Sequence, residues 1–138
     1  MATGPVPAPS PLAVGPVPAD VVVTCAQLVA ALPGEIDPGV ERRQVQDGAE
    51  RFAVWGDPVV VLECGVPRPD REEPPAIVNG VAWTVRDIGP GFRWTTRDLV
   101  VNVSVDVPDA YDNGAELVNP LAAPLQQVVP LAPDAPTS

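Results

Sequence analysis

The stretch VVVLEC, residues 59–64, decides the fold, because it is an unbroken apolar run that ends in a glutamate and a cysteine. A run of this length is typical of a strand, and its lack of alternation indicates burial on both faces. We therefore expect it to be the central strand of a sheet. It follows Gly56-Asp57-Pro58, a turn signal that separates it from the residues before it.

Three elements are predicted before this turn. Strands at 40–46 and 50–55 flank Asp47-Gly48, a dipeptide that favours a hairpin, so they should be antiparallel neighbours. A helix is expected over residues 25–32, with Thr24 as its cap. The Pro-Gly pair that follows should end this helix.

Further strands are predicted after the central one. Asn79-Gly80 indicates a hairpin between residues 77–78 and 81–86. A strand over 92–97 and a long half-buried strand over 99–107 follow, because apolar and polar residues alternate. In the first of these two, we expect the aromatic residues to point into the core and the arginines to point out, the four residues being Phe92, Trp94, Arg93 and Arg97.

A last helix is predicted from Asn113, with apolar residues at helical spacing and a kink or restart at Asn119-Pro120. The predicted fold class is therefore α+β, a mainly antiparallel sheet of about five to six strands with two helices packed on one face and one disulfide. The apolar positions of the last helix are Leu117, Leu121, Leu125 and Val128.

The chain of 138 residues fits one domain. Fifteen of its 20 prolines crowd into both ends and one internal loop, segments that are poor candidates for regular structure. We expect a Pro/Ala-rich linker or stalk over residues 1–19, a single α+β domain over 20–129, and a disordered C-terminal tail over 130–138.

The two cysteines, Cys25 and Cys64, lie outside any metal-binding pattern, and a disulfide is favoured over two buried free thiols. Closing a loop of about 40 residues should stabilise the domain by about 4 kcal/mol. Such a bond persists outside the cytoplasm, so an extracytoplasmic location is expected, anchored to the cell membrane or released from it. The Pro/Ala-rich beginning agrees with an exported protein whose signal or anchor precedes this sequence, and a cytosolic protein is the alternative.

Composition excludes several classes of function. The net charge is −10, with eight arginines and no lysine, which disfavours nucleic acid and anionic lipid as partners. We expect contact with the membrane only through an N-terminal anchor outside this sequence. There is no histidine, and a disulfide leaves no thiolate, so we predict a non-enzymatic protein without a cofactor.

A metal site is not predicted, although acidic residues cluster late in the chain. Their spacing fits no EF-hand, and helix capping or a solvent-exposed acidic loop explains the same residues. Glu35 and Asp37 in an earlier turn have the same interpretation. The side chains of this cluster that offer oxygen ligands to calcium are Asp106, Asp109, Asp112, Asn113 and Glu116.

A ligand or partner surface is predicted around the loop of residues 65–76 and the strand end at Trp55. Core positions explain the three tryptophans, Trp55, Trp83 and Trp94, better than a stacking platform does, and we expect Trp55 to be the least securely buried. The predicted surface comprises Trp55, Asp57, Arg68, Arg71, Arg93 and Arg97.

Three functions agree with these features. The first is an envelope domain that binds a protein or a cell-wall component. The second is a carboxylate-based enzyme or small-ligand-binding domain that uses Trp55, Arg93 and Arg97. The third is a structural spacer without a partner. The identity of a ligand and the oligomeric state do not follow from the sequence.

Several motifs resemble a known family. They are AVWGDP at 53–58, ECGVPRP at 63–69 and VNGVAW at 78–83, with CAQL at 25–28, ALP at 31–33 and TTR at 95–97. Together they are similar to the actinobacterial family called domain of unknown function 3515, over most of residues 20–129. The resemblance implies an exported, membrane-anchored or lipid-anchored protein, and it implies no activity.

Overall fold

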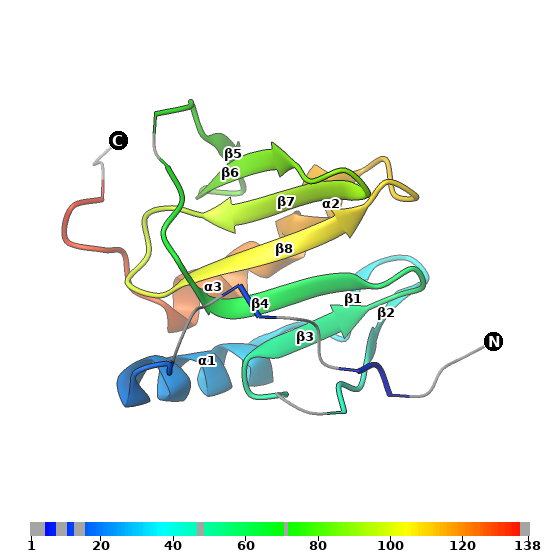
Figure 1. Ribbon diagram of the computed structural model, residues 1–138, viewed down its shortest axis with the longest axis horizontal. Helices are drawn as coiled ribbons and strands as arrows, with labels where there is room; N and C mark the ends of the chain where they lie inside the picture. Colours follow the sequence, from blue (N-terminus) through cyan, green and yellow to red (C-terminus); the bar gives the residue numbers. More distant parts are fainter. Residues whose placement is uncertain (1–4, 8–10, 13–15, 47–48, 71, 136–138) are drawn as a thin grey trace.

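The computed structural model describes residues 5–7, 11–12, 16–46, 49–70 and 72–135. Within them, eight strands form one curled antiparallel sheet in the order β1-β2-β3-β4-β8-β7-β6-β5 (Figure 1). The strands are β1 (Glu35–Asp37), β2 (Val40–Arg43), β3 (Phe52–Trp55), β4 (Val60–Val66), β5 (Ala76–Val78), β6 (Val81–Asp87), β7 (Gly91–Thr96) and β8 (Asn102–Pro108). The helices are α1 (Ala19–Ala31), α2 (Gly114–Val118), the 3₁₀ helix η1 (Asn119–Leu121) and α3 (Ala122–Val128).

The predicted architecture of about five to six strands with two helices on one face is wrong. The sheet has eight strands and curls into a half-barrel, and the helical residues are divided among short pieces. β1 is the strand that the pattern does not reveal, since three residues between a glycine and a proline show no period. The C-terminal helical segment is broken because Pro120 and Pro124 lack backbone donors, and the predicted interruption at Asn119-Pro120 is confirmed.

The run that suggested a central strand forms β4, which lies between β3 and β8 in the middle of the sheet. Leu62 and Cys64 are fully buried on one face, against the helices. The predicted disulfide is confirmed, and it joins Cys64 to Cys25 of α1 with their Cα atoms 5.6 Å apart. The first helix is thereby fixed to the centre of the sheet.

The hydrophobic core lies between the sheet and the helices. Figure 1 shows α1 and α3 on one side of the sheet, and α1 and α3 also contact each other. Leu117, Leu121 and Leu125 are completely buried, as their helical spacing predicts. All three tryptophans are in this core, so the core interpretation is confirmed.

The first helix is longer than predicted, because it begins at Ala19, directly after Pro18. Thr24 is not its cap, and the Thr24 hydroxyl donates to the carbonyl of Asp20 inside the helix. The valines at 21–23 have low helix propensity, so sequence placed the start too late. Packing of Leu28 and Val29 in the core offsets that local preference.

The two-residue hairpin at Asn79-Gly80 is confirmed. Val78 pairs with Val81, and Asn79 and Gly80 both have positive φ, 51° and 86°. The antiparallel pairing of β2 with β3 is also confirmed, but the proposed turn at Asp47-Gly48 lies outside the described residues. Such hairpins are predictable because two residues determine the turn.

The last long strand is shorter than expected and begins at Asn102. Residues 99–101 precede it, and Leu99 forms an isolated bridge with Leu131. For the predicted strand at 92–97, the expectation that aromatic residues are buried and arginines are exposed also fails for two residues. Phe92 is 44% exposed, whereas Arg97 is buried because its guanidinium donates to the carbonyl of Glu73.

The chain ends contact the domain at several points. Val6 forms a parallel bridge with Val45, and Ala132 is buried and donates to the carbonyl of Asp98. Among the helices of the described ranges, none is both long and apolar enough to cross a membrane.

Candidate ligand-binding site

The structure brings together two of the predicted surface residues, Arg68 and Arg93, which line the same hollow. Trp55 is completely buried on the core face of β3, and Asp57 is exposed in the turn that follows. Arg97 is buried beside Glu73. The sixth predicted residue, Arg71, lies outside the described residues.

Trp55 is sealed rather than loosely held, so the expectation that it is the least buried tryptophan is wrong. Its indole nitrogen donates to the carbonyl of Pro33 over 3.0 Å, and the guanidinium of Arg42 lies 5.6 Å from the ring centroid. Burial lowers the pKa of Arg42. This ring belongs to the core and offers no surface for stacking.

The sheet face opposite the helices carries a row of buried polar side chains. Cross-strand pairing places Glu63, Ser104, Thr95 and Thr84 side by side across four adjacent strands, β4, β8, β7 and β6. Their exposed fractions are 3%, 2%, 9% and 4%. A polar row is expected on a face without helices, but burial of that row requires that other parts of the chain cover it.

Two segments provide this cover. The N-terminal segment passes over β4, where the backbone N–H of Leu12 donates to both carboxylate oxygens of Glu63 at 2.9 and 3.0 Å (Figure 1). The segment after β4 crosses the ends of β8 and β7 on its way to β5 (Figure 1). Arg51 also pairs with Glu63 at 3.1 Å and donates to the carbonyl of Cys64. The buried carboxylate of Glu63 is therefore compensated by both charge and hydrogen bonds.

A second polar row lies beside the first. Arg93 of β7 is directly opposite Asp106 of β8 and donates to both of its carboxylate oxygens, at 2.7 and 3.0 Å. This hydrogen bonding raises the pKa of Arg93, against the smaller effect of burial. On its other side, Arg93 is opposite Arg86 of β6. Like charges at paired positions repel each other, so the pairing of Arg93 with Arg86 destabilises the sheet unless another group compensates it.

The two rows form one side of a hollow of about 380 Å³. Thr84, Arg86, Arg93 and Thr95 contribute the sheet side, and the loop of residues 66–70 and Leu12 contribute the rim. Three of the eight arginines, Arg68, Arg86 and Arg93, line this hollow. The volume lies in the range that small-molecule sites occupy.

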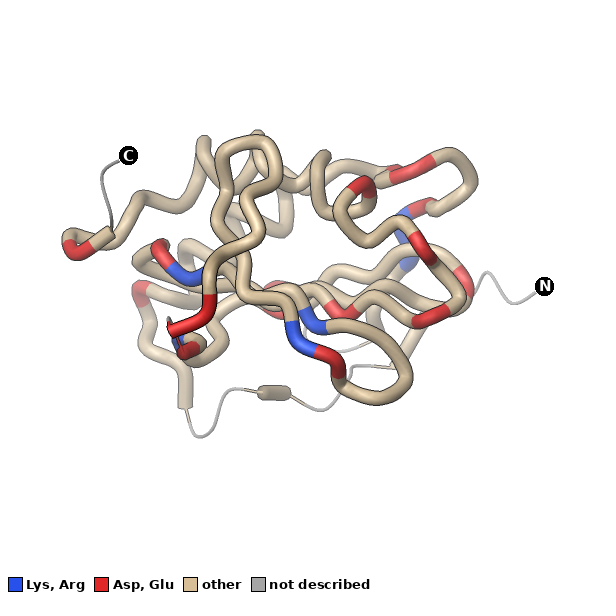
Figure 2. Tube along the Cα trace, turned by 90° about the horizontal axis from the view of Figure 1, so that it is seen from above, with Lys and Arg blue, Asp and Glu red and all other residues tan. Residues whose placement is uncertain are grey.

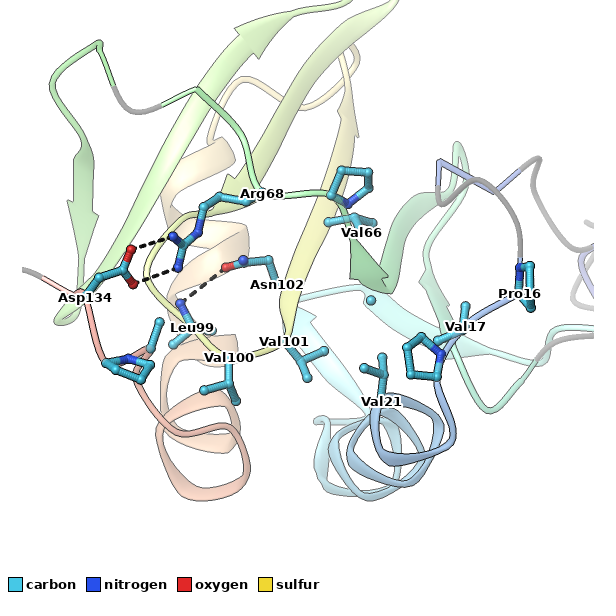
Figure 3. Close-up of a pocket in the computed structure, with 15 residues that line it drawn as sticks. Pro16, Val17, Val21, Val66, Arg68, Leu99, Val100, Val101, Asn102 and Asp134 are labelled. Carbon is cyan, nitrogen blue, oxygen red and sulfur yellow. Dashed lines mark hydrogen bonds and ion pairs between the residues drawn. The ribbon is translucent and has the colours of Figure 1, made fainter.

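A second hollow, of about 590 Å³, lies on the other side of the same loop, and Arg68 lines both. In Figure 3 the Arg68 side chain extends toward Asp134, while Val17 and Val21 lie across the hollow, on the side of α1. Arg68 donates to both oxygens of Asp134 at 2.7 and 3.1 Å, and this bonding raises the pKa of Arg68. Val100, which is 49% exposed, adds an apolar surface.

A third hollow, of about 640 Å³, lies beside the edge strand β5 and is mainly apolar. Ile77 and Leu131 line it and are 61% and 68% exposed. It contains none of the predicted site residues.

Charge is distributed unevenly over the molecule. Figure 2 shows acidic residues along many loops, and arginines in a few small groups close to acidic residues. Within the described part of the chain, no group of three or more metal-ligating side chains is close enough to hold a metal ion. The same part holds no free cysteine. The donors that line the hollow of about 380 Å³ are instead guanidinium and hydroxyl groups, which bind oxyanions.

Sequence reasoning missed Thr84, Arg86 and Glu63. Thr84 and Arg86 are polar residues two positions apart in β6, and Arg93 and Thr95 have the same spacing in β7. Residues at this spacing share one face of a strand, so this pattern is the signal that could have identified Thr84 and Arg86. Glu63 lies inside an apolar run, and its charge is compensated by Arg51, 12 residues earlier in the sequence.

Comparisons with known proteins place the chain in a family. Neither the curated proteins nor the solved structures show a significant match to it. A family model covers almost the whole chain, including each strand and helix of the described residues. Because its residues 2–133 match the family described as "Protein of unknown function (DUF3515)", the chain belongs to that family.

Proposed function

We propose that this protein is a non-enzymatic binding module of the cell envelope, anchored to the membrane or released from it, whose partner is an envelope protein or a cell-wall component. The Cys25–Cys64 disulfide indicates an oxidising, extracytoplasmic environment, which supports this location. The binding surface consists of the loop after β4 and the hollows on its two sides.

The observation that carries the proposal is the position of Arg68. It is exposed, stands between two hollows and is held by an acidic partner, Asp134, in the C-terminal segment. The loop around it contains Pro67 and Pro69, which restrict the backbone before any partner arrives. A preorganised loop with apolar and charged surfaces lowers the entropic cost of binding.

The second predicted function, an enzyme or small-ligand site that uses Trp55, Arg93 and Arg97, has less support. Trp55 is on the core face, Arg93 is on the opposite face, and Arg97 is buried against Glu73. These three side chains do not converge on one cavity. A structural spacer, the third possibility, predicts that no partner binds.

Two matched substitutions test the surface. Val100→Asp places a charge in the hollow of about 590 Å³, and Val23→Asp makes the same change on an exposed part of α1 outside it. The immobilised domain is exposed to isolated cell-wall fragments and, separately, to solubilised envelope proteins, and bound material is quantified. We expect Val100→Asp and Arg68→Ala to reduce binding at least about tenfold, and Val23→Asp to leave it unchanged. Binding that all three variants retain at the native level, or that the native domain lacks, contradicts the proposal.

A further inference from the structure

We propose that Thr84, Arg86 and Arg93 form a binding site for a phosphate group, and that the ligand of this domain carries phosphate. The inference rests on the proposed binding function and specifies the chemistry of one of its hollows.

Two arginines face each other across neighbouring strands at this hollow. Arg86 and Arg93 occupy directly paired positions on β6 and β7, where like charges are unfavourable. Asp106 binds Arg93, but within the described residues the Arg86 side chain has no ion pair or hydrogen bond. An anion between the two guanidinium groups would turn this repulsion into attraction.

The hollow also contains a buried hydroxyl group without a hydrogen-bond partner among the described residues. Thr84 is 4% exposed, lines the same hollow, and its Oγ1 has no hydrogen-bond partner in the described part of the chain. Burying a hydroxyl without a partner costs stability, so such a group requires a reason. The indole nitrogens of Trp83 and Trp94 are also unpartnered, but these rings belong to the core. Thr84 is on the opposite face, paired with Thr95 and two residues from Arg86.

The hydrogen-bond donors of the hollow come from several positions on two strands. The Arg93 fork is partly occupied by Asp106, so its remaining N–H groups, the free Arg86 fork and the Thr84 hydroxyl approach the hollow from different strand positions. A planar carboxylate is satisfied by one fork, whereas a tetrahedral phosphate accepts donors from several directions. The hollow of about 380 Å³ holds a phosphate group with a small attached group.

The charge of the rest of the molecule makes this grouping informative. The net charge is −10, so no general attraction brings anions to the surface. Yet three of the seven arginines in the described residues line one small hollow, in which one carboxylate, Asp70, also lies. Such local concentration is what a site for an anionic group requires.

The test is a titration of the whole chain followed by the amide NMR signals. The probes are inorganic phosphate, dimethyl phosphate as a phosphodiester, and acetate at matched ionic strength. We expect phosphate to shift the signals of β6 and β7, and acetate to bind at least about tenfold more weakly. Preference for the diester identifies a phosphodiester-containing partner, and preference for inorganic phosphate identifies a free phosphate ligand. Equal binding of acetate, or no shifts in β6 and β7, overturns the inference.

Variants separate binding from a structural role. Arg86→Gln should weaken phosphate binding at least about tenfold, while Arg43→Gln, an equal change of charge on β2, should not. Thr84→Val removes the unsatisfied hydroxyl, so it should maintain or raise the melting temperature and still weaken phosphate binding. Unchanged phosphate binding in Arg86→Gln or Thr84→Val overturns the inference. In the cell-wall and envelope-protein assays the discriminating variant is Val100→Asp, whose position lines the hollow of about 590 Å³ and not the hollow of Thr84, Arg86 and Arg93, so failure of either proposal can be told from failure of the other.

Discussion

Removing the disulfide gives the most direct test of the energetics of the fold. Cys25 and Cys64 are separated by 39 residues, and both are completely buried between α1 and β4. In the chain-entropy model, opening a loop of this size releases the unfolded chain and costs about 4 kcal/mol of stability. Alanine is the suitable replacement at both positions, since serine would place a hydroxyl in an apolar core.

The assay is urea unfolding followed by the fluorescence of the three tryptophans, all of them in the core. With a denaturant slope of about 2 kcal/mol per molar urea, 4 kcal/mol corresponds to a midpoint lower by about 2 M in the double variant. The control is a reducing agent, which should lower the midpoint of the native protein and leave that of the double variant unchanged. Midpoints that agree within about 0.5 M would refute the reasoning, because the bond would then contribute little beyond its packing.

Three further predictions concern neighbouring parts of the sheet. Burial, and then the charge of Asp57, raise the pKa of Tyr111. The contribution of the neutral tyrosine to the free energy of unfolding is therefore complete below the unfolded pKa near 10, and it is lost as pH rises through the folded pKa. Tyr111 is the single tyrosine, so ultraviolet titration follows it directly, and Asp57→Asn should lower its midpoint; an unchanged midpoint contradicts this cause. Gly56→Ala should cost about 2 kcal/mol in urea unfolding, because φ is +74° and the new Cβ would lie 2.6 Å from the Tyr111 hydroxyl, and a loss near zero would count against it. Glu63→Gln should cost about 3 kcal/mol, because it leaves Arg51 without its buried charge partner, and a neutral result would show that Arg51 finds compensation elsewhere.

The parts of the fold that sequence predicted are those that depend on few residues. The hairpin at Asn79-Gly80 needs two residues with positive φ, and β4 needs one apolar run. The disulfide needed only the absence of other cysteine partners. In each case the deciding information lies within a short window or in the composition.

The elements that sequence missed depend on contacts from elsewhere. β1 has three residues, and it is a strand because Glu35 and Asp37 pair with β2. The first turns of α1 contain valines that disfavour a helix, and packing decides the outcome. Arg97 is buried rather than exposed, and its guanidinium donates to the carbonyl of Glu73, 24 residues away.

The candidate site was predicted only in part, for the same reason. Arg68 and Arg93 were identified as separate exposed cations, but their common hollow depends on the path of the loop after β4. The pairing of Arg86 with Arg93 depends on the register of β6 and β7, which one residue more or less in their connection would change.

The face without helices combines two costs that a structural role alone would avoid. Polar side chains are buried there under extended segments, and Glu63 is stabilised by Arg51 and by the N–H of Leu12. Thr84 has no such compensation, and Arg86 faces a like charge. A structural spacer could replace both residues by apolar or neutral ones and become more stable. Their presence at one hollow is therefore better explained by a ligand than by the stability of the fold.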